Sequence, residues 1–95
     1  MNTFTHDQIK TTVTNLVARE IRMSAAEIPA DQPLTRYGLD SLAATVLVGE
    51  IEDAMGLQLD ATMLWDHQTI NALVAYVEEE LSAAGKSAQS VAEAA

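Results

Sequence analysis

Residues 38–42 read Gly38-Leu39-Asp40-Ser41-Leu42, and this stretch decides where a central helix of the chain begins. Asp40 is a strong N-cap candidate, because its carboxylate can accept a hydrogen bond from an unpaired backbone N–H of the first turn. Ser41 then stands next to the positive end of the helix dipole and to further free N–H groups. An anionic group on the Ser41 hydroxyl would therefore be well placed.

The helix that starts near Asp40 is expected to end at Met55, because Gly56 is a typical helix-ending residue and an apolar Leu57 follows it. Rotation by about 100° per residue separates a core face from a polar face. The core face should hold Ala43, Ala44, Leu47, Val48, Ile51, Ala54 and Met55. The opposite face should hold Ser41, Thr45, Gly49, Glu52 and Asp53, with Leu42 and Val46 in or beside it.

The face around Ser41 is thus expected to carry exposed apolar side chains bordered by acids. Such a mixture suits transient docking, in which charge guides the encounter and a small apolar patch makes contact. The alternative is that Leu42 and Val46 pack on a neighbouring loop.

Two further long helices are expected on either side of this one. A first helix from about Thr5 to Met23 is indicated by the capping-box pair Thr5 and Gln8 and by an apolar stripe of Ile9, Val13, Leu16, Val17 and Ile21. A last helix is capped by Thr69 and carries the stripe Ile70, Leu73, Val74, Val77 and Leu81.

The connections complete the predicted fold. Residues 24–40 form a long first loop around Pro29 and Pro33, pinned to the core by Ile28 and Leu34, with Tyr37 as a third candidate. A short helix is expected around Met63 to His67. The fold class is all-α: a small four-helix bundle of three main helices and one short helix. Residues 1–85 form one domain, and residues 86–95 are expected to be a disordered tail.

Composition narrows the function. The 95 residues are 48% hydrophobic, enough for one thin core, and contain no cysteine, which excludes disulfides and thiolate metal sites. No apolar stretch is long enough to span a membrane. We expect a cytoplasmic monomer without a metal site.

The net charge of −9 is unevenly placed. Acids and bases cancel in residues 1–37, whereas residues 38–85 hold nine acids and no lysine or arginine. Phosphate backbones would be repelled, so nucleic acid is not an expected partner. Basic protein surfaces would be attracted, although solubility is an equally good reason for the charge.

Two other interpretations of Ser41 compete with the one in which its hydroxyl carries an anionic group. A serine in the first turn of a helix usually caps it. An enzyme nucleophile is less well supported, because residues 39–43 do not form a Gly-x-Ser-x-Gly elbow and nothing in the sequence brings His6 or His67 to Ser41.

The chain resembles an acyl carrier protein, and most closely the carrier domains of polyketide synthases, over about residues 5–82. One motif is Tyr37-Gly38-Leu39-Asp40-Ser41-Leu42-Ala43-Ala44, which is similar to the family's attachment motif. The second is residues 56–62 followed by Met63-Leu64-Trp65-Asp66-His67-Gln68-Thr69-Ile70, similar to the family's aromatic-Asp-His-Pro-Thr stretch. Gln68 stands where the family often has proline.

The resemblance implies a carrier without catalytic groups, on which Ser41 bears 4'-phosphopantetheine taken from coenzyme A. A phosphopantetheinyl transferase would attach the arm, helped by Asp40 and gripping Leu42. Acyl or polyketide intermediates would then be held as thioesters for a ketosynthase, an acyltransferase or an acyl-adenylate ligase. The expected docking residues are Thr45, Val46, Glu50, Glu52, Asp53 and Asp66.

A second hypothesis is an unmodified helical module that docks basic partners through its acidic half. Neither hypothesis uses Trp65 or Tyr76, which we expect to be core or half-buried residues, nor His67, which we expect to be structural or exposed.

Overall fold

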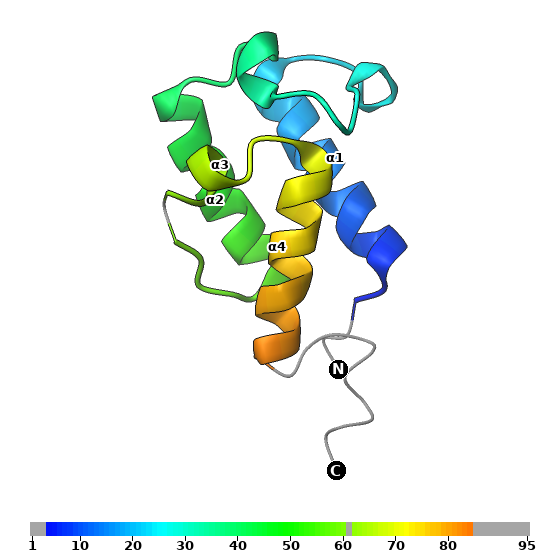
Figure 1. The fold of residues 1–95 in the computed structure, drawn as a ribbon, viewed down its shortest axis with the longest axis vertical. Helices are drawn as coiled ribbons and strands as arrows, with labels where there is room; N and C mark the ends of the chain where they lie inside the picture. The colour runs from blue at the N-terminus through cyan, green and yellow to red at the C-terminus, as the bar shows by residue number, and fades with distance from the viewer. Residues whose placement is uncertain (1–3, 61, 85–95) are drawn as a thin grey trace.

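The computed structural model describes residues 4–60 and 62–84. These residues form α1 (His6–Ile21), η1 (Ala25–Glu27), η2 (Leu34–Tyr37), α2 (Ser41–Met55), α3 (Met63–Asp66) and α4 (Ile70–Ala83), where η marks a short 3-10 helix. Figure 1 shows α1, α2 and α4 as the long helices, with the short α3 beside α2. The predicted all-α bundle of three main helices and one short helix is confirmed. The predicted tail, residues 86–95, lies outside the described residues.

Helix α1 begins where its capping box predicts. The Gln8 N–H donates to Thr5 Oγ1 at 3.1 Å, and the Thr5 N–H donates to Gln8 Oε1 at 2.9 Å. The helix ends two residues earlier than predicted, at Ile21, because Arg22 adopts a left-handed backbone with φ of 61°. The stripe of Ile9, Val13 and Val17 is buried, as its spacing requires.

Backbone hydrogen bonds fix the long first loop to the start of α4. The Leu34 N–H donates to the Gln68 carbonyl at 2.8 Å, and the Asn71 N–H donates to the Ala30 carbonyl at 3.0 Å. Ile28 and Leu34 are buried, so the predicted pinning to the core is confirmed. The loop contains η1 and η2, which the sequence did not predict, and it leads into α2 as an anchored segment.

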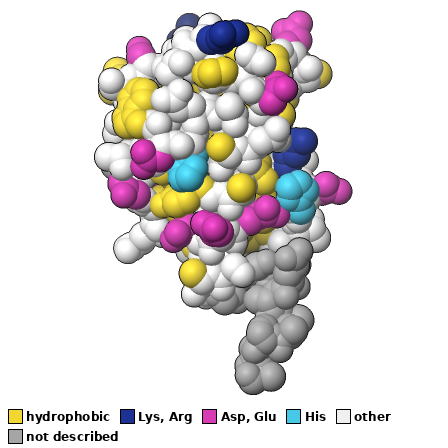
Figure 2. All heavy atoms as spheres, viewed as in Figure 1, with side chains coloured by type: hydrophobic (Ala, Val, Ile, Leu, Met, Phe, Trp, Pro, Cys, Tyr) yellow, Lys and Arg dark blue, Asp and Glu magenta, His cyan; other side chains and the backbone are white. Residues whose placement is uncertain are grey.

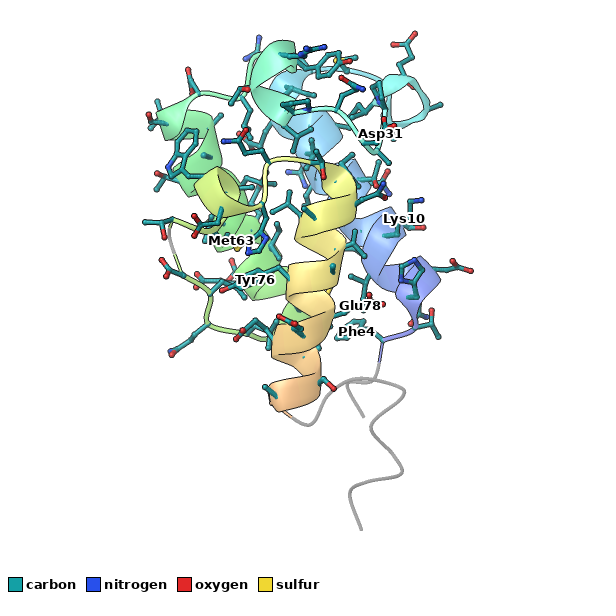
Figure 3. The ribbon with its side chains drawn as sticks, viewed as in Figure 1. Phe4, Lys10, Asp31, Met63, Tyr76 and Glu78 are labelled. Atoms are coloured by element: carbon teal, nitrogen blue, oxygen red, sulfur yellow. The ribbon has the colours of Figure 1, made fainter. Side chains whose placement is uncertain are left out.

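The core lies where α1 packs against α2 and α4. The predicted stripe of α4 is buried in full, and the Ala72 N–H donates to Thr69 Oγ1 at 3.0 Å, which confirms the predicted cap. Figure 3 shows Glu78 on α4 near the beginning of α1, where Glu78 Oε2 lies 2.7 Å from His6 Nδ1. The α2 contribution is Ala44, Leu47, Val48, Ile51 and Met55.

One member of the predicted α2 core face is wrong: Ala54 is exposed, and Ala43 is only half-buried. Both alanines lie at the margins of the buried stripe, where a small error in helix rotation exchanges core for solvent. Within residues 4–60 and 62–84, no helix is long and apolar enough to cross a bilayer.

Acidic and basic side chains are unevenly spread over the face drawn in Figure 2. Figure 2 shows a row of Asp and Glu side chains across the lower part of the described surface, with basic side chains at the upper edge and at one side.

Candidate functional site

A left-handed glycine sets the path of the chain into α2. Gly38 has φ of 96°, and its N–H donates to the Leu34 carbonyl to close η2. Nothing lies within 4 Å of a Cβ placed at Gly38, so the glycine is needed for its backbone conformation and not for space. The reversal turns Leu39 into the core, where it is 4% exposed. Leu39 thereby anchors the segment directly before Ser41.

Asp40, and not Ser41, caps α2. The Ala43 N–H donates to Asp40 Oδ1 at 2.9 Å, and the Asp40 backbone is extended, as an N-cap residue should be. Ser41 is exposed, and its hydroxyl makes no hydrogen bond with any part of the chain that the structure describes. The ordinary capping role is therefore already filled, which leaves the Ser41 hydroxyl available to another molecule at the helix N-terminus.

The residues after Ser41 extend an exposed surface along α2. Leu42 is 75% exposed and Val46, one turn later, is 44% exposed, so the alternative in which a loop covers them is wrong. The Thr45 hydroxyl donates to the Ser41 carbonyl at 3.0 Å. Thr45 is exposed as predicted, but its hydroxyl reinforces the first turn of the helix.

Glu52 is held inside the fold. Its Oε2 accepts a hydrogen bond of 2.7 Å from the Leu59 N–H, in the connection between α2 and α3. Glu52 is half-buried, and a bond of this length to a carboxylate is charge-assisted. The residue predicted to dock partners therefore fastens the connection to the end of α2.

Glu50 is turned toward α1. Its Oε2 lies 3.7 Å from the Arg19 guanidinium, and its Oε1 is buried with no hydrogen-bond partner among the described residues. Glu20 lies close by, and its pKa is raised above the ordinary 4.5 by burial first, then by the nearby Glu50 carboxylate, which favours a shared proton and repels a second negative charge, while Arg19 works against the rise. A proton on Glu20 would give Glu50 a donor.

Two predicted docking acids remain available to solvent. Asp53 and Asp66 are exposed, and their carboxylates form no hydrogen bond or ion pair in residues 4–60 and 62–84. The docking set predicted from sequence is thus divided. Its exposed members are Thr45, Val46, Asp53 and Asp66, whereas Glu50 and Glu52 face the protein. Leu42, predicted as the apolar contact of the transferase, is also exposed.

Trp65 corrects a prediction. The sequence predicts a core or half-buried position, but the Trp65 side chain is 42% exposed, while its neighbours Met63 and Leu64 on α3 are buried. A one-turn helix can bury only one side, and here the pair Met63 and Leu64 takes that side. Helix α3 packs against α2, so Trp65 adds a large exposed apolar side chain to the helix pair that carries Ser41.

Both histidines are engaged away from Ser41. His6 pairs with Glu78, and the His67 ring stacks on the Tyr76 ring with centroids 4.6 Å apart. Figure 3 shows Tyr76 on α4, facing the side on which α3 lies. Since no described histidine contacts Ser41, the site has no base of the kind that activates a serine nucleophile.

Comparison with known proteins gives one family. A model of the phosphopantetheine attachment site matches residues 11–77. The chain is 34% identical over 67 residues to a phenolphthiocerol/phthiocerol polyketide synthase of Mycobacterium tuberculosis, which is 70% of this chain and 4% of that synthase. It is 35% identical over 69 residues to polyketide synthase ThaG of Burkholderia thailandensis, which is 73% of this chain and 1% of that synthase. The chain therefore spans only a small part of these much longer relatives.

Two solved structures of carrier proteins match this chain over most of their own length. A free-standing peptidyl carrier protein from a secondary metabolic pathway of Acinetobacter baumannii is 42% identical with a TM-score of 0.75, covering 81% of this chain and 96% of that chain. The HMG-ACPI domain from the CurA module of Lyngbya majuscula is 29% identical with a TM-score of 0.77, covering 90% and 87%.

Proposed function

The chain belongs to the family of phosphopantetheine-binding carrier domains, and on that premise we propose that Ser41 is the residue that bears the arm. The protein is a non-catalytic carrier related to the carrier domains of polyketide and peptide synthases. The assignment of Ser41 is supported by the start of α2, where Asp40 and not Ser41 caps the helix. Asp40 supplies the cap, so the neighbouring hydroxyl is exposed and unbonded within the described residues.

The attachment reaction would take place at the Ser41 hydroxyl and leave a negative charge at the start of α2. The Ser41 Oγ forms a bond to the pantetheine-bearing phosphorus of coenzyme A, the bond from that phosphorus to the second phosphate breaks, and the adenosine bisphosphate half leaves. The hydroxyl proton passes to solvent or to the transferase. The product is a phosphodiester, whose negative charge lies at the positive end of the 15-residue helix α2. When bound, the arm supplies a thiol that carries acyl groups as thioesters.

Each neighbour of Ser41 has a proposed part. Asp40 holds the first turn of α2 in place while its second carboxylate oxygen is open to the transferase. Leu42 offers the transferase an exposed apolar side chain directly beside the hydroxyl. The carrier adds no catalytic group, and its contribution is to raise the local concentration of the tethered substrate at each partner enzyme.

The partners form part of the same proposal. A phosphopantetheinyl transferase loads the arm, and synthase enzymes use it: a ketosynthase, an acyltransferase or an acyl-adenylate ligase. Because the similar proteins include polyketide synthases and a peptidyl carrier, we propose polyketide or hybrid peptide–polyketide synthesis ahead of fatty acid synthesis. A cytoplasmic setting follows from the need for coenzyme A as donor.

Intact-mass measurement tests the assignment. We expect the chain, incubated with coenzyme A and a broad-specificity phosphopantetheinyl transferase, to gain the mass of one phosphopantetheine. Ser41→Ala should gain nothing, whereas Ser24→Ala is a matched control, since the Ser24 hydroxyl caps nothing and should be dispensable. No gain in the wild-type chain, under conditions that modify a control carrier, would support the unmodified interaction module instead.

A further inference from the structure

We propose that Gln68 positions Ser41 for attachment of the arm, through hydrogen bonds that run from the end of α3 to the segment before α2. The inference rests on the proposed function, because it concerns how the Ser41 hydroxyl is presented to the transferase. Gln68 lies in the connection between α3 and α4 and acts on Ser41 only through the residues between them in space. It is therefore a positioning residue and not a catalytic one.

Gln68 holds two separate parts of the fold. Its side-chain Nε2 donates to the Trp65 carbonyl at 3.1 Å, and its own carbonyl accepts a hydrogen bond of 2.8 Å from the Leu34 N–H. The Trp65 carbonyl lies in the last turn of α3, where helix carbonyls have no partner within the helix. Figure 1 shows the connection from α3 to α4 below the first loop, to which Leu34 belongs. Gln68 thus joins the end of α3 to η2.

A short run of anchored residues leads from Leu34 to Ser41. Leu34 is fully buried, and its carbonyl accepts hydrogen bonds from the Gly38 N–H and, at 3.4 Å, from the Leu39 N–H. Leu39 is buried as well, and Asp40, the next residue, caps α2. Because this run is hydrogen-bonded and anchored at both ends, a shift of Leu34 is passed on to the start of α2.

The side-chain hydrogen bond of Gln68 orients its backbone. Gln68 lies outside α3 and α4, so no helical hydrogen bond fixes its φ and ψ, and its side chain is exposed. The bond from Nε2 to the Trp65 carbonyl, three residues back, closes a ring that restricts the backbone at this position. Without that bond the Gln68 carbonyl is free to turn away from the Leu34 N–H. Loss of the side-chain donor therefore loosens a backbone contact of the first loop.

Other contacts keep the bundle folded when this bond is lost. The cap of α4 by Thr69 does not involve the Gln68 side chain, nor does the hydrogen bond of 3.0 Å from the Asn71 N–H to the Ala30 carbonyl. A variant at position 68 should therefore fold, with the segment before Ser41 less well ordered. The transferase must order that segment when it binds, which raises KM and leaves kcat unchanged.

The test combines amide hydrogen exchange with the kinetics of modification by a broad-specificity phosphopantetheinyl transferase and coenzyme A. Gln68→Ala and Gln68→Glu both lack the side-chain donor, whereas Gln68→Lys keeps a donor that can reach the Trp65 carbonyl. We expect the first two to raise the exchange rate of the Leu34 amide and the KM for the carrier, each by about threefold, the effect of one exposed hydrogen bond. Gln68→Lys should stay within about twofold of the wild type. An effect of charge would instead place Gln68→Ala between the other two variants and would overturn the role of the donor.

Gln58→Ala is the matched control and should behave as the wild type. Gln58 is an exposed glutamine in the connection between α2 and α3, and its side chain has no hydrogen bond in residues 4–60 and 62–84. Unchanged exchange at Leu34 in Gln68→Ala, or faster exchange with an unchanged KM, overturns the positioning role and leaves the assignment of Ser41 intact. An equal rise in the exchange rate of the Val13 amide in α1 would show a general loss of stability and overturn it too. A wild-type chain that is never modified overturns the assignment of Ser41 and this proposal together.

Discussion

Glu52→Ala should destabilise the fold, although Glu52 looks like a surface acid in the sequence. The carboxylate is the acceptor for the Leu59 N–H at 2.7 Å, and this contact bridges seven positions between the last turns of α2 and the connection to α3. Removing it frees one end of the segment that positions α3 and Trp65. The neighbouring Asp53→Ala removes an exposed acid from the same turn without breaking any contact in the described chain.

The size of the effect follows from the kind of bond. A hydrogen bond to a charged group contributes about 1.5–3 kcal/mol, and partial exposure of Glu52 lets water replace some of it, so we expect about 1–2 kcal/mol. For a domain of this size that corresponds to a fall in Tm of roughly 4–16 °C. Both acids lie near the C-terminal end of α2, where the dipole disfavours them, and this gain on removal cancels between the two variants.

Urea and thermal unfolding, followed by circular dichroism, measure the difference. Glu52→Gln keeps a neutral acceptor and should fall between the wild type and Glu52→Ala. Asp53→Ala should stay within about 0.5 kcal/mol of the wild type. If Glu52→Ala and Asp53→Ala unfold together, the Glu52 carboxylate does not secure the connection, and its role as a docking residue returns.

Two further predictions concern the start of α2 and its contact with α1. Asp40→Ala should lose about 1 kcal/mol in urea unfolding while Asp40→Asn loses only a few tenths, because Asn can still accept from the Ala43 N–H; equal losses would show that the cap is not the cause. The raised pKa of Glu20 means that its contribution to stability is complete below about pH 4.5 and is lost as pH rises through the folded-state pKa. Glu20→Gln should therefore be more stable than the wild type near pH 7 and show no such gain near pH 4, and a gain that does not change with pH would contradict the carboxyl pairing.

Four of the helix boundaries were predictable because their causes are local, whereas the end of α1 at Ile21 was not. The capping pair Thr5 and Gln8, the cap Asp40, the helix-ending Gly56 and the cap Thr69 each act over three or four residues, and the structure has all of them. The stripes of α1 and α4 were predictable for the same reason, since a helix of several turns repeats its buried side often enough to fix its rotation.

The exposure of Trp65 could not be predicted in this way. Helix α3 has only four residues, so it offers one turn and no repeat from which a rotation can be derived. Which side is buried depends on the fit of Met63 and Leu64 against neighbouring helices, a property of the packing and not of the α3 sequence. A large aromatic residue is usually assigned to the core on average behaviour, and that average is wrong here.

The contacts of Glu50, Glu52 and Glu78 could not be predicted from the sequence, because their partners are distant in sequence or are backbone groups. Net charge counts every carboxylate equally, but the structure gives more than half of these nine a partner inside the protein. The engaged acids are Asp40 with the Ala43 N–H, Glu50 with Arg19, Glu52 with the Leu59 N–H, Asp60 with Thr62, and Glu78 with His6.

Because carboxylates hold the fold together, substitutions of these acids affect both the stability of the domain and its recognition by partner proteins. A small core leaves helix starts and loop connections to be held in place by polar contacts. Residues 38–85 contain no lysine or arginine, and there these contacts are made by carboxylates that accept hydrogen bonds from backbone N–H groups. A carboxylate engaged in this way keeps its negative charge, but its position is fixed by the fold. Reversing the charge of Glu50 or Glu52 would therefore disturb the bundle first, and a slower reaction with a partner would report lost structure. Among the described acids of α2 and α3, only Asp53 and Asp66 have carboxylates without a contact, so they can report electrostatic docking cleanly, and Val46 and Trp65 are their apolar counterparts.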